Sequence, residues 1–378
     1  TVAAPLLGRG HEALAAALRA NPGAIPPELS APAAAIRLSS NENPRGPAAA
    51  AIDGIRAALG DSSRYAFDTP RQLRDAIAAK QGVKPEQVLV GCGSTELLKM
   101  SVDAYLDPRV SLVTAAPTFE EVAQGAELKG SRVHALPVDS SLKLDLDGML
   151  AKAPGAGLIY VNNPNNPTGT IHSASTIADF VQRARRQAPG ALILIDEAYH
   201  EYVEDPSYAS ALPIALAEKD VIVLRTFSKV YGLAGLRIGF AMGRPETLSR
   251  LSREQLSLSL NALGVAAALG ALKDDTVVPR EKKLNREARD YTADAFTRAG
   301  YKITPSHANF LMIDIRRDIR GFQEECRKRN VLVGRPFPPL ATQARLSIGT
   351  MDEMRSAVPI CLDVLGAAPS RMTGGAGR

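Results

Sequence analysis

Short hydrophobic runs alternate with amphipathic segments through the middle of the chain. The runs are rich in Val, Ile and Leu without regular polar alternation, which is typical of strands that helices cover on both faces. They predict six strands, within residues 87–93, 109–117, 157–164, 191–199, 221–229 and 237–243. Helical patterns such as 175–187 lie between them. The order predicts an α/β fold with a mostly parallel sheet between helices.

The last hundred residues carry a different pattern. A long helical stretch over 280–300 precedes short apolar runs at 308–315, 331–334 and 344–349, with a helical pattern at 321–330. We expect these segments and the Ala- and Pro-rich N-terminal segment to form a smaller αβ domain. The predicted boundaries are 46–268 for the large domain, and 1–45 with 269–378 for the small domain.

The composition narrows the classes of partner. The chain has 378 residues, of which 45% are hydrophobic and 22% charged, as in ordinary globular proteins. A net charge of +5, no Trp and 5% aromatic residues argue against nucleic acid as a partner. The three cysteines and five histidines lack the spacing of metal ligands, so we expect no metal site.

The sequence gives only limited information on where in the cell the protein is found. No apolar run reaches the roughly 18 residues that a membrane-spanning helix needs, so we expect no membrane partner. The numbering begins at Thr1 and not at Met. We expect a cytoplasmic protein, with an exported, periplasmic one as the alternative if a leader was removed before Thr1.

Polar clusters follow the ends of several predicted strands, where ligands bind in open α/β sheets. GCGSTE (91–96) opens a helix, so the backbone N–H groups of Gly93, Ser94 and Thr95 would form an anion site. A plain Gly-Ser turn is the alternative. NNPNNPTG (162–169) contains Asn166, whose amide would donate to a ligand oxygen, or would only stabilise a turn.

Two charged residues lie at the ends of apolar strands. Asp196 would need a cation there, because a buried carboxylate is costly. Burial of Lys229 would favour its neutral amine, a nucleophile toward carbonyl carbon. Thr226, Ser228 and Arg237 are suited to phosphate. A basic ring nitrogen, an aldehyde and a phosphate together describe pyridoxal 5′-phosphate (PLP).

Seven motifs stand in the order and spacing of fold-type I PLP-dependent aminotransferases. They are SNENPRGP, GCGSTELL, APTFEEV, NNPNNPTG, DEAY, TFSKVYGLAGLRIGF and ARLSIGT. The chain most closely resembles the histidinol-phosphate aminotransferase group, over roughly residues 35–365.

The resemblance implies a role for each matching residue. Lys229 would bind the cofactor as a Schiff base and then move the proton between substrate and cofactor. Asp196 would keep the pyridine nitrogen protonated, and Asn166 and Tyr199 would bond to the phenolic oxygen. Phe119 would stack on the ring, with plain core packing as its alternative. The cofactor phosphate would be held by Gly93, Ser94, Thr95, Thr226, Ser228 and Arg237.

The resemblance also implies residues for the substrate and a partner subunit. Arg345 would bind the substrate α-carboxylate, Arg335 its side-chain phosphate, and Asn41 lies in a matching motif at the substrate. Tyr65 would reach a phosphate in the neighbouring subunit, which implies a homodimer with shared active sites. A surface position is the alternative for Tyr65 and for Arg345.

The implied activity is amino transfer to 2-oxoglutarate by a ping-pong Schiff-base mechanism, with histidinol phosphate as the first candidate donor. Cys92, Thr95 and the stretch QLSLSLN (255–261) depart from the group's pattern, and Arg335 stands in a shifted context. An aromatic or other amino acid is therefore a second candidate donor. The sequence also leaves open a PLP-dependent decarboxylase, lyase or amino-acid oxidase, and a non-catalytic PLP-fold regulator.

Overall fold

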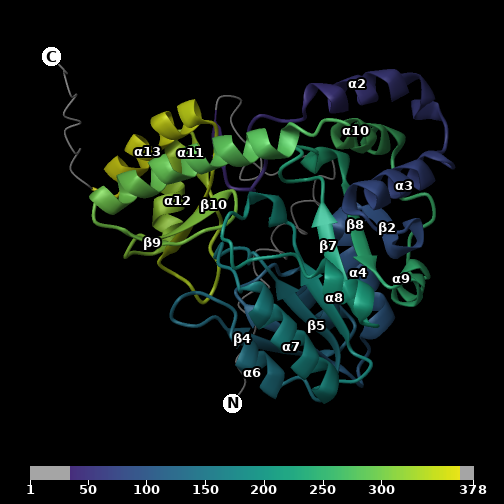
Figure 1. The fold of residues 1–378 in the computed structure, drawn as a ribbon. Coiled ribbons are helices and arrows are strands. Elements are labelled where there is room, and N and C mark those ends of the chain that lie inside the picture. Colours follow the sequence, from purple (N-terminus) through teal and green to yellow (C-terminus); the bar gives the residue numbers. More distant parts are fainter. Residues whose placement is uncertain (1–34, 367–378) are drawn as a thin grey trace, which may run out of the picture.

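A seven-stranded sheet forms the centre of the protein in the computed structural model, which describes residues 35–366 (Figure 1). The strand order is β2-β8-β7-β6-β5-β3-β4, and β8 runs antiparallel to its two neighbours. The strands are β2 (Val88–Cys92), β3 (Ser111–Ala116), β4 (Arg132–Pro137), β5 (Ala156–Asn162), β6 (Leu192–Asp196), β7 (Val221–Thr226) and β8 (Ile238–Gly243). The predicted α/β fold and all six predicted strands are confirmed.

The edge strand β4 was not predicted from the sequence. Its segment RVHALP contains only exposed and half-buried residues, and it includes Arg132 and His134. None of its residues is buried, so it lacks the continuous apolar run that marks the other six strands of this sheet.

Both faces of the sheet are buried under helices. Along β6, Ile193 and Ile195 pack into one hydrophobic cluster, whereas Leu192 and Leu194 pack into another. Because successive residues of a strand face opposite sides of the sheet, all four of residues 192–195 in β6 are apolar. The covering helices are α4 (Gly93–Tyr105), α5 (Glu121–Leu128), α6 (Leu146–Ala151), α7 (Ala174–Gln187), α8 (Leu212–Ala217) and α9 (Pro245–Ser252).

Three further helices, α2 (Ala49–Ala58), α3 (Thr69–Gln81) and α10 (Ala262–Leu272), pack together beside β2 and β8 (Figure 1). Small residues allow α2 and α10 to touch, because a Cβ at Gly270 would collide with the Ala50 carbonyl. Within residues 35–366, no helix is long and apolar enough to cross a bilayer.

The C-terminal segments form a second layer of structure with their own hydrophobic cluster, which also includes Leu38. β9 (Lys302–Thr304), β10 (Phe310–Asp314) and β12 (Gln343–Ser347) make an antiparallel sheet, and β1 (Ile36–Leu38) pairs in parallel with β11 (Val331–Val333). Helices α11 (Val277–Arg298), α12 (Ile319–Lys328) and α13 (Met351–Val364) pack around them. The domain boundaries stay a prediction, and residues 1–34 and 367–378 of the predicted small domain lie outside the described residues.

Candidate active site

A cavity of about 490 Å³ lies beyond the carboxyl ends of β5, β6 and β7. It is closed from the other side by the segment around Asn41 and by residues that follow β11. The cavity brings together thirteen of the residues singled out from the sequence: Asn41, Ser94, Thr95, Phe119, Asn166, Asp196, Tyr199, Thr226, Ser228, Lys229, Arg237, Arg335 and Arg345.

Two predicted residues do not line this cavity. Gly93 lies directly behind the Arg237 guanidinium, and Tyr65 is 72% exposed at a distance from the cavity lining. A second, slightly larger cavity of about 660 Å³ is lined by Lys143, His172 and Lys302 among others, and it contains none of the predicted residues.

Asp196 is a buried carboxylate at the end of β6 whose hydrogen-bond partners are neutral. The Tyr160 hydroxyl donates to its Oδ2 (2.9 Å), and the Ala198 N–H donates to its Oδ1 (3.0 Å). Burial raises the pKa of Asp196 to about 6, while these hydrogen bonds and the charge of Lys229 act to lower it. A positively charged ring nitrogen beside it would favour the ionised carboxylate.

Tyr160 was missed in the sequence. It lies within the apolar run of β5, and its hydroxyl also accepts a hydrogen bond from Asn162 Nδ2 (3.1 Å). A tyrosine in a strand buried on both faces needs a partner for its hydroxyl, and this was the available signal.

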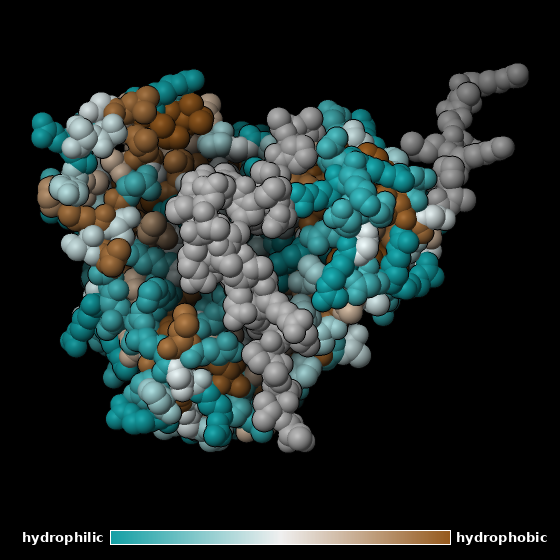
Figure 2. Space-filling view, turned by 180° about the vertical axis from the view of Figure 1, so that it is seen from behind, coloured by the Kyte–Doolittle hydropathy of each residue, from teal (hydrophilic) through white to brown (hydrophobic). Residues whose placement is uncertain are grey.

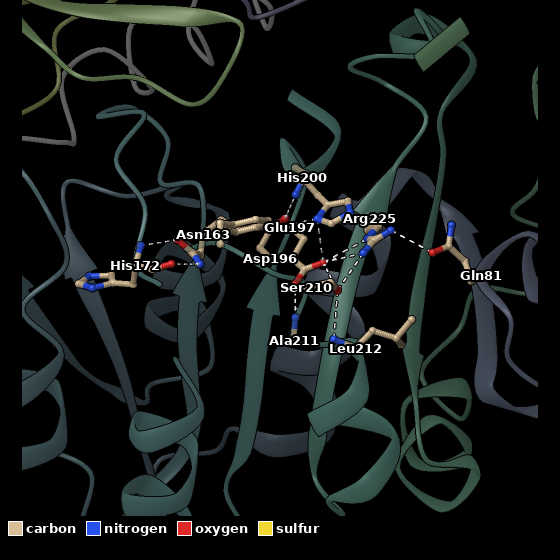
Figure 3. Close-up of polar contacts among 12 residues, drawn as sticks. Gln81, Asn163, His172, Asp196, Glu197, His200, Ser210, Ala211, Leu212 and Arg225 are labelled. Atoms are coloured by element: carbon tan, nitrogen blue, oxygen red, sulfur yellow. Dashed lines mark hydrogen bonds and ion pairs between the residues drawn. The ribbon is translucent and has the colours of Figure 1, made fainter. Parts of the chain in front are cut away.

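The neighbouring Glu197 belongs to a separate polar network that ties β6 to β7 (Figure 3). Arg225 donates from Nε and Nη2 to Glu197 Oε2 (3.1 and 3.0 Å), and from Nη1 to Gln81 Oε1 (3.0 Å). The Ser210 hydroxyl and the Ala211 N–H also donate to Glu197. Arg225 therefore links β6 to β7. Because its charge is paired with Glu197 within the protein, an anionic ligand would have to bind other cations.

Arg237 occupies the end of the cavity beside the first turn of α4. Its guanidinium donates to Thr95 Oγ1 (3.4 Å) and Ser228 Oγ (3.5 Å), and its backbone is left-handed, with φ 57°. Gly93 has φ 71°, and a Cβ there would collide with the guanidinium. A cation, two hydroxyl groups and a helix N-terminus thus meet in one corner, and this set of donors fits a phosphate.

Thr226 serves the loop that carries Lys229. Its Oγ1 accepts a hydrogen bond from the Ser228 N–H (3.0 Å) and donates to the Ile238 carbonyl (3.4 Å). Lys229 itself is half-buried, with Nζ 5.6 Å from the centre of the Tyr199 ring.

Arg345 is a buried cation at the opposite end of the cavity. It donates to Asn166 Oδ1 (2.7 Å) and to the Ser39 carbonyl (2.5 Å), while its Nε has no hydrogen-bond partner within residues 35–366. Among the described residues, no carboxylate lies within ion-pair distance of it. Burial lowers the pKa of Arg345 to about 10, with a further lowering from the nearby Arg335. A buried cation without a counter-ion calls for an anionic ligand.

Asn41 joins the N-terminal segment to the site. Its Nδ2 donates to the Tyr199 hydroxyl (3.1 Å), and its Oδ1 accepts from Ser347 Oγ (2.7 Å). Ser39 and Ser40 next to it also line the cavity, and the sequence analysis missed both, although Ser40 opens the motif that supplied Asn41. Other lining residues that the sequence analysis missed are Thr118, Asn162, Gln323 and Phe337.

The cavity fits PLP at each of its functional groups. Lys229, Asp196 and Phe119 line the cavity together with Arg237 of the phosphate corner. The fold and this cavity define a PLP-dependent enzyme of fold type I.

Comparison with known proteins gives the family. The chain belongs to the class I and II aminotransferase family, whose sequence profile matches residues 33–359. It is therefore a PLP-dependent aminotransferase.

Within this family, several proteins similar to this chain are named histidinol-phosphate aminotransferase. The histidinol-phosphate aminotransferase of Moorella thermoacetica is 36% identical over 334 residues, which cover 87% of this chain and 85% of the relative. That of Symbiobacterium thermophilum is also 36% identical, over 88% of this chain and 91% of the relative. The crystal structure of histidinol-phosphate aminotransferase from Sinorhizobium meliloti in complex with PLP superposes with a TM-score of 0.81 at 27% identity, covering 87% of this chain and 90% of that chain.

Proposed function

We propose that this aminotransferase takes its amino group from histidinol phosphate and passes it to 2-oxoglutarate in two successive half-reactions. The observation that carries the proposal is Arg345, a buried cation without a counter-ion among the described residues, in the same cavity as Lys229 and Asp196. Arg335 lies near it and adds a second positive charge. The likeness to enzymes named histidinol-phosphate aminotransferase, at 36% identity, supports the same donor.

We assign the chemistry at the donor's α-carbon to Lys229, Asp196 and Tyr199. PLP supplies an electron-withdrawing ring that stabilises negative charge at this carbon. Lys229 Nζ would hold the cofactor covalently, give way to the donor's amine, and then carry the proton from the α-carbon. Asp196 would keep the ring nitrogen protonated. Tyr199, oriented by Asn41, would donate a hydrogen bond to the ring oxygen.

The remaining residues would bind and orient. Asn166 has its Oδ1 engaged by Arg345, which leaves Nδ2 to donate toward the ring oxygen. Ser94, Thr95, Ser228 and Arg237 would bind the cofactor phosphate, with the backbone of Gly93 and the loop held by Thr226. The substrate-binding residues of this proposal are Arg345, Arg335 and Asn41.

We further propose a homodimer, in which Tyr65 completes the partner's site. Tyr65 and Phe67 are 72% and 74% exposed in the segment between α2 and α3. In Figure 2, hydrophobic surface gathers at the upper left, the side on which α2 and α10 lie. Exposed aromatic and apolar residues of this kind support a face that a second copy covers.

A screen of amino donors tests the donor. Purified holoenzyme is mixed with histidinol phosphate, aromatic amino acids and other amino acids, each with 2-oxoglutarate, and glutamate formation is measured. We expect the highest kcat/KM for histidinol phosphate. A higher kcat/KM for an amino acid would overturn the donor, and carbon dioxide release or oxygen uptake in place of glutamate would overturn the reaction type.

A further inference from the structure

One ion pair involves Arg335, which lines the cavity, and Glu120, which follows the lining residue Phe119. Arg335 Nη2 donates to Glu120 Oε2 (2.7 Å), although the two residues are 215 positions apart. Arg335 follows β11 in the C-terminal part of the fold, and Glu120 directly precedes α5 on the large sheet. The pair therefore connects the two parts of the molecule beside the cavity.

The Glu120 carboxylate pairs with Arg335 and does not cap the helix that follows it. Glu120 occupies the N-cap position of α5, but its side chain makes no capping hydrogen bond. It is instead directed to Arg335, and it stands next to Phe119 in the cavity wall. Both side chains keep contact with solvent, with 49% of Arg335 and 31% of Glu120 exposed. The pair can thus open without leaving an unpaired buried charge.

Arg335 and Arg345 share one aromatic neighbour. Their guanidinium carbons lie 4.4 and 4.7 Å from the centre of the Phe337 ring. Two cations therefore stand at the same end of the cavity, and Glu120 neutralises one of them. The net charge that a donor meets there depends on whether Glu120 is paired with Arg335.

We propose that Glu120 sets the preference between classes of donor by competing with the donor's anionic group for Arg335. This inference rests on the proposed function, because it takes the Arg345 end of the cavity as the donor site. A donor with a single carboxylate is matched by Arg345 and leaves the Glu120–Arg335 pair closed. A phosphate monoester carries close to two negative charges and would bind both the Arg345 and the Arg335 guanidinium groups. It therefore has to displace Glu120 from Arg335.

The test uses two non-reactive ligands that share a ring and differ in their anionic group: 2-phenylethyl phosphate and 3-phenylpropionate. Their dissociation constants are measured on holoenzyme by calorimetry. E120Q should bind the phosphate roughly threefold to tenfold more tightly than wild type, and bind the carboxylate within about twofold of wild type, with the gain shrinking as salt is added. Unchanged or weaker phosphate binding, or an equal gain for both ligands, would overturn the inference.

Two variants sharpen this test. E121Q removes the same charge from the next residue, which is exposed in the first turn of the same helix, and it should leave both dissociation constants as in wild type. R335Q combined with E120Q should abolish the gain for the phosphate, and a gain that survives it would contradict the role of Arg335. Because neither ligand carries an amine, the result stands apart from the donor screen, whose failure alone would overturn the proposed donor.

Discussion

Asp196 is a buried carboxylate whose surroundings compensate its charge only in part. The sequence suggested that a carboxylate at the end of a buried strand needs a cation, whereas the structure surrounds it with a tyrosine hydroxyl and a backbone N–H. Neutral donors stabilise the charge only in part, so the pKa of Asp196 is raised to about 6 by burial. The carboxylate is thus costly to ionise until a positive group lies beside it.

This cost predicts a pH-dependent effect of D196N on the cofactor-free protein. The pKa of Asp196 in the folded protein exceeds its ordinary value of 3.8, so the folded state binds more protons than the unfolded chain between these values. Wild-type stability therefore falls as pH rises through about 6. The free energy of unfolding of D196N, relative to wild type, should rise by ~1.5 kcal/mol between pH 5 and pH 8 in urea titrations.

Asp205 provides the control for that measurement. Hydrogen bonds from Ser207 lower the pKa of this exposed carboxyl. Its contribution to stability therefore varies with pH only around and below pH 3.8. D205N should give the same difference from wild type at pH 5 and pH 8. An equal pH dependence in the two variants would contradict the assignment of the effect to Asp196.

Lys229 carries the second prediction at the residue scale. K229A should lower turnover by at least about 10²-fold, the usual contribution of a positioned acid–base group, and should also remove the covalent attachment of PLP. Borohydride reduction followed by mass spectrometry measures the attachment. Full turnover in K229A would contradict the role of Lys229.

At the scale of elements, the junction between β2 and α4 shapes the phosphate corner. A Cβ at Gly239 on β8 would collide with the Ser94 backbone, and a Cβ at Gly93 would collide with the Arg237 guanidinium. The close approach of these elements depends on the absence of side chains at both positions. The geometry of the corner is therefore a property of the backbone as much as of Arg237.

G93A should weaken PLP binding by about tenfold, because the added methyl group displaces Arg237, while Ala at positive φ also costs about 1 kcal/mol of stability. G82A is a matched control. Gly82 has φ 67°, close to the 71° of Gly93, but no atom of the described residues lies within 4 Å of its added Cβ. Fluorescence titration of the cofactor-free variants gives the PLP dissociation constants, and equal weakening in both would contradict a specific effect on Arg237.

The link between β6 and β7 gives a stability prediction. R225M leaves the Glu197 carboxylate buried without its cation, which should lower the free energy of unfolding by about 3–5 kcal/mol. R244M removes a cation paired with Glu246 at the surface, 2.6 Å away, and should cost less than about 1 kcal/mol. Urea unfolding of the two variants compares them, and a similar loss in both would contradict the importance of burial.

The elements were predictable where local sequence decides them. Six strands of the large sheet are largely apolar because their residues are mostly buried, so all six were recognised, whereas no residue of β4 is buried and its sequence lacks that signal. Polar residues at the ends of these strands could be singled out from the sequence, because ligands of open α/β sheets bind beyond the carboxyl ends of the strands. Contacts such as Asn41 to Tyr199 and Arg335 to Glu120 join distant segments, and no local pattern indicates which segments pack together.

On the scale of the whole molecule, the site lies where two differently built parts meet. The large sheet supplies Asp196, Lys229 and Arg237, whereas the N- and C-terminal segments supply Asn41 and Arg345. The cavity therefore depends on how these parts are held together. The proposed second copy would add Tyr65 as a residue from a third direction.

The dimer proposal predicts complementation between two variants that each lack one residue of the shared site. When K229A and Y65A are mixed after dissociation and reassociation, hybrid dimers should contain one intact site, so up to about a quarter of wild-type activity should return in a twofold-symmetric assembly. Light scattering should give about twice the chain mass of 40.1 kDa. A monomeric mass, or no recovered activity in proven hybrids, would contradict a shared site.

The first half-reaction tests the proposed function most directly. Stoichiometric histidinol phosphate is added to holoenzyme without an oxo acid while the cofactor absorbance is recorded. We expect the absorbance of the lysine-bound cofactor to be replaced by that of its aminated form, and 2-oxoglutarate then to restore the starting spectrum. An unchanged spectrum, or oxygen uptake without restoration by 2-oxoglutarate, would contradict the proposed function.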